Sequence, residues 1–117
     1  VGPEIIAGST RLKAGTATKM ILNMISTTTM IKLNKVYKNF MVDLNVSNKK
    51  LYNRAINIIS TITNENLNKS KKLLKESNGN VKSAIVMSYL KINYLDSIKI
   101  IKKYNGSISD IINKEKI

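Results

Sequence analysis

Over a long stretch early in the chain, residues that are nearly all apolar recur three or four positions apart. This spacing is the sequence feature that constrains the fold most. The positions are Ala17, Met20, Ile21, Met24, Ile25, Thr28 and Ile31. Because an α-helix turns once in about 3.6 residues, these side chains share one face. Ser9 or Thr10 can cap the start of such a helix, and Asn34 suits its end. The sequence therefore predicts a long helix over residues 10–33 with a continuous apolar face.

The segments on either side of this helix carry other patterns. In the first nine residues, β-branched side chains alternate with Gly2, Pro3 and Gly8, which predicts the end of a strand followed by a loop. In residues 36–46 apolar and polar side chains alternate loosely, which favours an extended connector or a short strand. A second helix is predicted over 48–63, because its apolar residues again recur at helical spacing. They are Leu51, Ala55, Ile58, Ile59 and Ile62.

After Asn64 the pattern changes to short amphipathic helices, each with its own start and stop. Asn78-Gly79 and Asn105-Gly106 are typical helix ends, and Asn80 and Asn93 are typical caps. We expect three short helices within 65–104, a last turn opened by Ser107, and no sheet beyond one or two short strands. The fold class is a mainly α fragment with a domain boundary near Asn64. Residues 65–117 form a small three-helix bundle that resembles a ubiquitin-associated (UBA) domain.

The part from 1 to 64 is expected to be incomplete. A strand end and two helices with wide apolar faces need a sheet to cover, and residues 1–64 contain none. The chain also lacks an initiator Met. We therefore expect a soluble piece of a larger protein, without a secretory signal or a membrane span.

Composition excludes several kinds of chemistry. The 117 residues contain neither Cys nor His, which excludes disulfides, thiolate metal sites and a Ser-His-Asp triad. The net charge of +13 raises the possibility of a nucleic-acid partner. However, Arg occurs only as Arg11 and Arg54, and the few aromatic residues form no stacking platform. We expect a solvated basic surface with no nucleic-acid partner, no metal and no cofactor.

The loop before the long helix is the best candidate for a binding site. It places Glu4, Ser9, Thr10, Arg11 and Lys13 where a strand is expected to meet a helix N-terminus. Free backbone N–H groups, hydroxyls and cations there suit an anionic ligand. The alternative is a simple helix cap with two surface cations, which can also pair with a partner subunit.

The same loop carries a resemblance to a known family. The runs Gly2-Pro3-Glu4 and Ala7-Gly8-Ser9-Thr10-Arg11-Leu12-Lys13-Ala14-Gly15-Thr16-Ala17, followed by Leu22–Thr27, Lys35-Val36-Tyr37 and Asn39–Asp43, resemble the N-acetylmuramic acid 6-phosphate etherases. The related glucokinase regulatory protein shares a looser form of this pattern. The resemblance continues weakly through residues 80–87. Thr28, Thr29, Asn34 and Lys38 depart from the usual small residues of the family, which puts a tight turn at Lys38 in doubt.

This resemblance implies that residues 1–64 end an α/β sugar isomerase (SIS) domain and that 65–117 form its helical appendage. It implies a cytoplasmic, homodimeric lyase that cleaves the D-lactyl ether of its sugar-phosphate substrate, giving N-acetylglucosamine 6-phosphate and D-lactate. Its catalytic glutamates lie upstream, so no catalytic residue is expected in this chain, and the piece alone should be inactive. Glu4, Ser9, Thr10, Arg11 and Lys13 are the expected substrate-binding residues. A non-catalytic sugar-phosphate-binding regulator and an isolated helical binding module are the alternatives.

Overall fold

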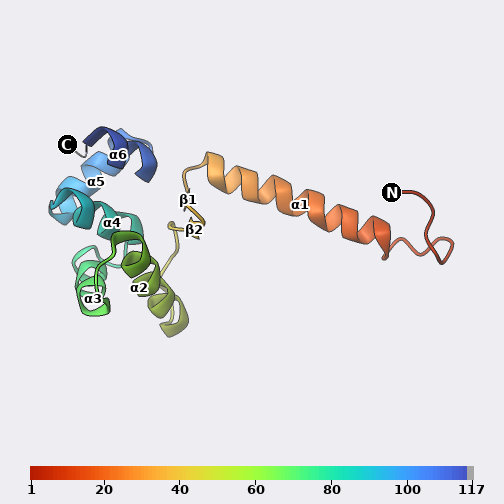
Figure 1. The fold of residues 1–117 in the computed structure, drawn as a ribbon, viewed down its shortest axis with the longest axis horizontal. Coiled ribbons are helices and arrows are strands. Elements are labelled where there is room, and N and C mark those ends of the chain that lie inside the picture. The colour runs from red at the N-terminus through yellow and green to blue at the C-terminus, as the bar shows by residue number, and fades with distance from the viewer. Residues whose placement is uncertain (116–117) are drawn as a thin grey trace. The chain divides into compact units, whose positions relative to one another are not determined.

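The computed structural model describes residues 1–115, which separate into two compact units. The first unit is Val1–Lys32, and the second begins at Leu33. Over the described residues the chain contains six helices and one two-stranded hairpin (Figure 1). The expectation of a mainly helical chain is therefore confirmed. None of the helices in this range is long and apolar enough to cross a membrane.

The first unit consists of a loop and the helix α1, Lys13–Lys32. The long helix predicted from the apolar spacing is present, although none of its residues is buried within the unit. The strand end predicted before it is not present. Residues 1–12 close on themselves instead, since Ser9 N donates to Ile6 O at 3.0 Å and Thr10 N to Gly8 O at 3.1 Å. A strand needs a hydrogen-bonded neighbour, and these local bonds form a turn.

The second unit opens with a short antiparallel hairpin of β1, Val36–Tyr37, and β2, Phe40–Met41. The two residues between the strands form a tight turn, in which Lys38 adopts a φ of 54°. A non-glycine residue pays a steric cost in this left-handed region, so the turn forms despite the lysine. Val42 follows the hairpin and is almost fully buried, which anchors this connector on the helices.

Five helices complete the unit. They are α2 Lys49–Thr63, α3 Leu67–Glu76, α4 Val81–Leu90, α5 Tyr94–Lys103 and α6 Ile108–Glu115. The predicted helix over 48–63 and the three short helices within 65–104 are confirmed. The single turn expected after Ser107 is longer than predicted and forms the eight-residue α6.

The core of this unit surrounds α4. Figure 1 shows α4 between the pair α2 and α3 and the pair α5 and α6, and α4 contacts all four of them. One cluster of buried apolar side chains forms the core and consists of Val42, Ala55, Ile56, Ile58, Ile59, Ile62, Leu73, Leu74, Val81, Ala84, Ile85, Met87 and Ile108. Five of these come from α2. The boundary expected near Asn64 thus falls inside one compact unit, because α2 shares its core with α3 and α4. The division into domains at 1–64 and 65–117 stays a prediction about family architecture.

Candidate functional site

Glu4 caps the start of α1. Its Oε2 accepts a hydrogen bond from Lys13 N at 3.0 Å, and its Oε1 accepts one from Ala14 N at 2.9 Å. The first N–H groups of a helix have no partner within the helix and carry a partial positive charge, so a carboxylate there is stabilising. Two of the N–H groups expected to face an anionic ligand are therefore occupied by a side chain of the same loop.

Ser9 and Thr10 lie in the turn that leads into α1. Ser9 is half-buried and Thr10 is exposed. Their backbones hold the turn, and Ser9 O also accepts from Leu12 N at 3.4 Å. Neither hydroxyl donates or accepts a hydrogen bond within residues 1–115, so both are available to a ligand.

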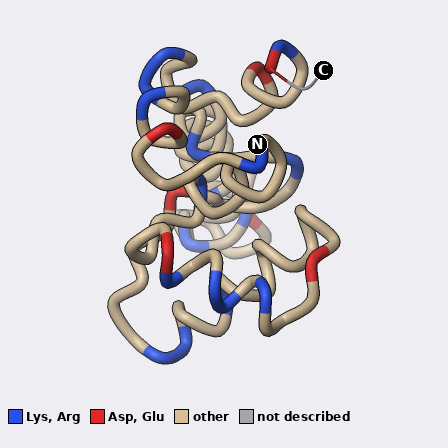
Figure 2. Tube along the Cα trace, turned by 90° about the vertical axis from the view of Figure 1, so that its left-hand side faces the viewer, with Lys and Arg blue, Asp and Glu red and all other residues tan. Residues whose placement is uncertain are grey.

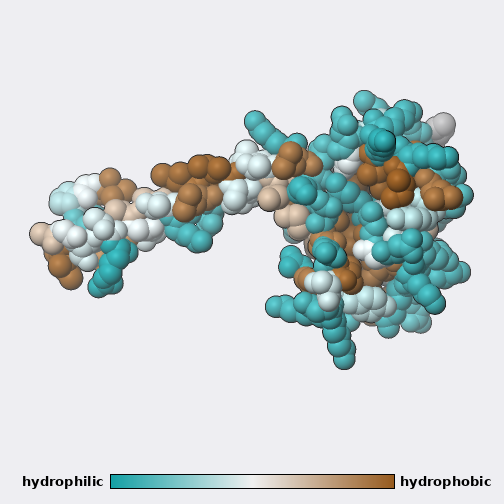
Figure 3. All heavy atoms as spheres, turned by 180° about the vertical axis from the view of Figure 1, so that it is seen from behind, coloured by the Kyte–Doolittle hydropathy of each residue, from teal (hydrophilic) through white to brown (hydrophobic). Residues whose placement is uncertain are grey.

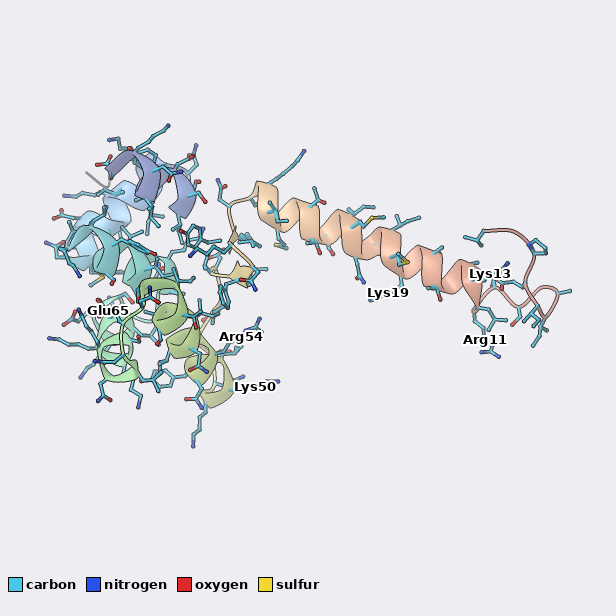
Figure 4. All side chains as sticks on the ribbon, in the orientation of Figure 1. Arg11, Lys13, Lys19, Lys50, Arg54 and Glu65 are labelled. Atoms are coloured by element: carbon cyan, nitrogen blue, oxygen red, sulfur yellow. The ribbon has the colours of Figure 1, made fainter. Side chains whose placement is uncertain are left out.

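Arg11 and Lys13 are exposed cations on either side of the helix start. They line a shallow hollow of about 570 Å³, together with Val1, Leu12, Thr16, Ala17 and Met20. Figure 4 shows the two side chains extending in different directions from the chain, so they do not converge on one point. Neither forms an ion pair with a carboxylate among the described residues. The loop thus brings Glu4 and Lys13 together through a backbone contact and leaves both cations free.

A second, polar groove lies between the hairpin and α2 on the other unit. It encloses about 530 Å³ and is lined by Asn39, Phe40, Lys50, Asn53, Arg54, Asn57, Ile58 and Thr61. Lys50 and Arg54 extend from the side of α2 that faces away from α3 (Figure 4). Asparagine amides can both donate to and accept from sugar hydroxyls, and the two cations suit an anionic group. The lining contains no carboxylate, so the groove offers cations and amides for binding and no carboxylic acid or base.

This groove was not predicted from the sequence, although a signal for it exists. Lys50 and Arg54 are four residues apart, as are Asn53 and Asn57, and such pairs lie on one side of a helix. The apolar spacing of α2 indicates its buried face only. The polar face becomes a groove only because the hairpin, with Asn39 and Phe40, folds beside it.

Several carboxylates of the second unit make structural contacts. Glu65 Oε1 lies 2.7 Å from Lys69 Nζ, which lowers the pKa of this carboxyl, and it accepts a hydrogen bond from Ser88 Oγ at 3.3 Å. These bonds join the loop before α3 to α4. Glu115 accepts from the Tyr104 hydroxyl at 2.6 Å, which lowers the pKa of the carboxyl. Within residues 1–115 no three acidic, Cys or His side chains gather in a way that could hold a metal ion.

The positive charge is spread over the second unit. Figure 2 shows Lys and Arg at many separate points of the trace, with acidic residues between them. A nucleic-acid interface normally gathers cations on one face or along one helix. The distribution favours the solvated basic surface inferred from composition.

Known proteins resemble this chain over nearly its full length. An N-acetylmuramic acid 6-phosphate etherase of Bacillus subtilis is 50% identical over 112 residues, which cover 96% of this chain and 37% of the relative. The etherase of Mycoplasma mycoides is 48% identical over 114 residues, covering 97% of this chain and 38% of the relative. The etherase of Prochlorococcus marinus is 50% identical over 107 residues, which cover 92% of this chain and 34% of the relative. The family described as the C-terminal lid domain of glucokinase regulatory protein matches residues 38–85.

Over nearly its full length the chain is similar to the C-terminal part of N-acetylmuramic acid 6-phosphate etherases. The family resemblance noted in the loop and the first helix is therefore confirmed. The chain spans less than two fifths of the length of these etherases and corresponds to their C-terminal part. The match to the lid-domain family begins at Lys38, in the hairpin turn, and continues to Ile85 in the middle of α4.

Proposed function

We propose that this chain acts as the C-terminal part of an N-acetylmuramic acid 6-phosphate etherase, which releases D-lactate from its sugar-phosphate substrate in the recycling of cell-wall amino sugars. The observation that carries the proposal is the identity of about half of all residues with etherases over 96% of the chain. The chain's own contribution is binding and positioning. Its exposed cations and amides can hold a sugar phosphate, whereas no carboxylate of residues 1–115 lines the hollow at Arg11 and Lys13 or the polar groove.

The phosphate-binding role falls to the loop before α1. Within residues 1–115, Arg11 and Lys13 have no acidic partner and the hydroxyls of Ser9 and Thr10 are unengaged, so these four groups can contact a phosphate. Glu4 acts differently from the expectation of a ligand-contacting residue. Its carboxylate holds the backbone of Lys13 and Ala14, and it thereby positions the cations.

A chimeric enzyme tests the proposal. The matching C-terminal part of the Bacillus subtilis etherase is replaced by this chain, and D-lactate release from N-acetylmuramic acid 6-phosphate is measured. We expect turnover by the chimera and none by the 117-residue chain alone. A correctly folded chimera without turnover would contradict the assignment.

Substitutions in the chimera then test the loop. Arg11→Ala and Lys13→Ala should each lower kcat/KM by about tenfold or more, on the order of 1.4 kcal/mol, because each removes a charge that binds phosphate. Lys19→Ala, on the exposed surface of α1, is the matched control and should keep normal activity. If activity is lost only because subunits dissociate, the two residues serve an interface instead.

The second candidate function is that of a non-catalytic regulator that binds a sugar phosphate. The match of residues 38–85 to the lid domain of glucokinase regulatory protein favours this candidate. A chimera that binds the sugar phosphate tightly but releases no lactate would support this alternative. For the whole protein we further propose a homodimeric, cytoplasmic enzyme. In it, residues 1–64 end a sugar isomerase domain, and 65–117 form a UBA-like bundle.

A further inference from the structure

A further hollow of the second unit shares no lining residue with the polar groove of that unit. It encloses about 450 Å³ and is lined by Val46, Tyr52, Lys71, Lys72, Leu74, Lys75, Asn78 and Gly79. Its floor is apolar, because Leu74 is buried there beside Val46 and the ring of Tyr52. Its rim is formed by α3 and by the turn after α3. None of its eight lining residues is acidic.

The cations on this rim are unbalanced. Of the four lysines of α3, Lys69 pairs with Glu65 at 2.7 Å, and Lys72 lies 3.8 Å from Glu76. Lys71 and Lys75 have no acidic partner among the described residues. They stand four residues apart on one side of the helix, an arrangement in which like charges repel. A ligand that brings negative charge to this rim would relieve the repulsion.

The turn at the end of the hollow is held in place by the backbone. Asn78 and Gly79 both have positive φ, of 53° and 79°, and Gly79 N donates to Leu74 O at 2.9 Å. A Cβ added to Gly79 would lie 4.0 Å from Val46 Cβ, so the turn and the floor are in close proximity. The hollow is thus a formed feature of the fold.

The shape and lining indicate the class of ligand. An open hollow encloses one side chain presented by a larger partner better than it encloses a small molecule, which normally loses most of its surface to a pocket. The rim contains lysine and no arginine, and the floor contains one aromatic ring, which disfavours base recognition and stacking. An apolar floor with a cationic rim instead complements an apolar side chain flanked by carboxylates.

We propose that this hollow is a docking site for an acidic peptide segment of a protein partner. One apolar anchor residue of the segment contacts Val46, Tyr52 and Leu74. Flanking Asp or Glu side chains pair with Lys71 and Lys75. This binding is separate from the proposed sugar-phosphate site, and the two can fail independently.

The experiment uses the isotope-labelled 117-residue chain, titrated by NMR with a short synthetic peptide in which one Phe is flanked by glutamates. We expect shift changes concentrated at Tyr52, Asn78 and Gly79, with binding that weakens as salt is raised. A peptide with glutamines in place of the glutamates, and one with Ala in place of Phe, should each bind about tenfold more weakly or worse.

Variants of the chain complete the test. The double variant Lys71→Gln and Lys75→Gln should weaken binding about tenfold or more while its spectrum stays that of a folded protein. The matched control is Lys99→Gln and Lys102→Gln, which removes two exposed lysines from α5, outside the hollow, and should bind as the wild type does. The proposal is overturned if the glutamine peptide binds equally well, or if both double variants behave alike. It is also overturned if a single-stranded oligonucleotide binds the hollow more tightly than the acidic peptide.

Discussion

Asparagine fixes most of the helix ends of the second unit. Asn48, Asn66, Asn80 and Asn93 each precede a helix, and each side chain accepts a hydrogen bond from the backbone N–H three residues later. Four further asparagines adopt left-handed conformations at turns, namely Asn34, Asn64, Asn78 and Asn105. Asn has a short polar side chain that tolerates both roles. These eight asparagines thus have a structural function.

Replacing a cap should therefore destabilise the unit. Asn80→Ala removes the acceptor for Ser83 N, which lies 3.0 Å away at the start of the central helix. We expect a loss of about 1 kcal/mol in the free energy of unfolding, measured with urea. Asn113→Ala, on the exposed face of α6, is the control and should change stability little. Equal effects of the two substitutions would show that the Asn80 cap contributes nothing.

A second residue-scale prediction concerns pH. Lys35 Nζ lies 2.6 Å from Asp43 Oδ2, and this hydrogen bond lowers the pKa of the Asp43 carboxyl below its ordinary value of 3.8. Because the folded-state pKa is below the unfolded one, the pair stabilises the fold above about pH 4, and this contribution is lost as pH falls through the folded-state value. Both side chains are more than a third exposed, so solvent screening limits the contribution to a few tenths of a kcal/mol, roughly.

Urea unfolding of the wild type and of Asp43→Asn measures this contribution. The variant should be slightly less stable near neutral pH and equal to the wild type in strong acid, where Asp43 is protonated in both the folded and the unfolded chain. A difference that persists unchanged in acid would mean that the effect does not arise from the charge of Asp43.

At the scale of elements, the packing of α2 decides how far the core of the second unit extends. Ile59, in its middle, is fully buried in the core shared with α3 and α4. Ile59→Ala should reduce the free energy of unfolding by roughly 2–5 kcal/mol, because it deletes buried methyl groups and leaves a cavity. Leu95→Ala, at an exposed position of α5, is the comparison and should be close to neutral. A small effect at Ile59 would mean that α2 is not part of the cooperative unit.

The elements were predictable to different degrees. Apolar spacing and asparagine caps are local signals, so α1 to α5 lie within a few residues of where the sequence places them. The assignment of α2 to the same core as α3 was not predictable, since spacing shows that a helix has an apolar face but not what covers it. The sequence identifies the residues of the loop before α1. The role of Glu4 as a cap was not predictable, because it depends on how residues 5–12 turn. The groove at Lys50 and Arg54 needed the hairpin beside α2.

At the scale of the whole molecule, α1 has an apolar surface that its own unit does not cover. Met20, Ile21, Met24 and Ile25 are each more than half exposed within their unit. Figure 3 shows brown, apolar side chains along this helix. Only Lys19 and Lys32 introduce charge after its first residue. Contiguous apolar surface of this kind usually contacts a partner.

We therefore expect the 117-residue chain to self-associate through α1. Analytical ultracentrifugation of the chain at a concentration on the order of tens of micromolar should detect a species larger than the monomer. Met24→Lys combined with Ile25→Lys should shift it toward monomer, whereas Lys71→Gln with Lys75→Gln should leave it unchanged. A strictly monomeric wild type would contradict this expectation.

The position of α6 in the core has a consequence for synthesis on the ribosome. Ile108 and Ile111 are almost completely buried, and α6 packs on the central helix α4. A nascent chain therefore cannot complete the packing around α4 until residues 108–115 have left the exit tunnel, whereas α2 and α3 can dock on α4 earlier. A product whose translation stops before Ile108 would expose part of α4, and proteases that degrade unfolded chains would remove it. Helix α6 in this way makes stable folding of the second unit dependent on translation through residue 115.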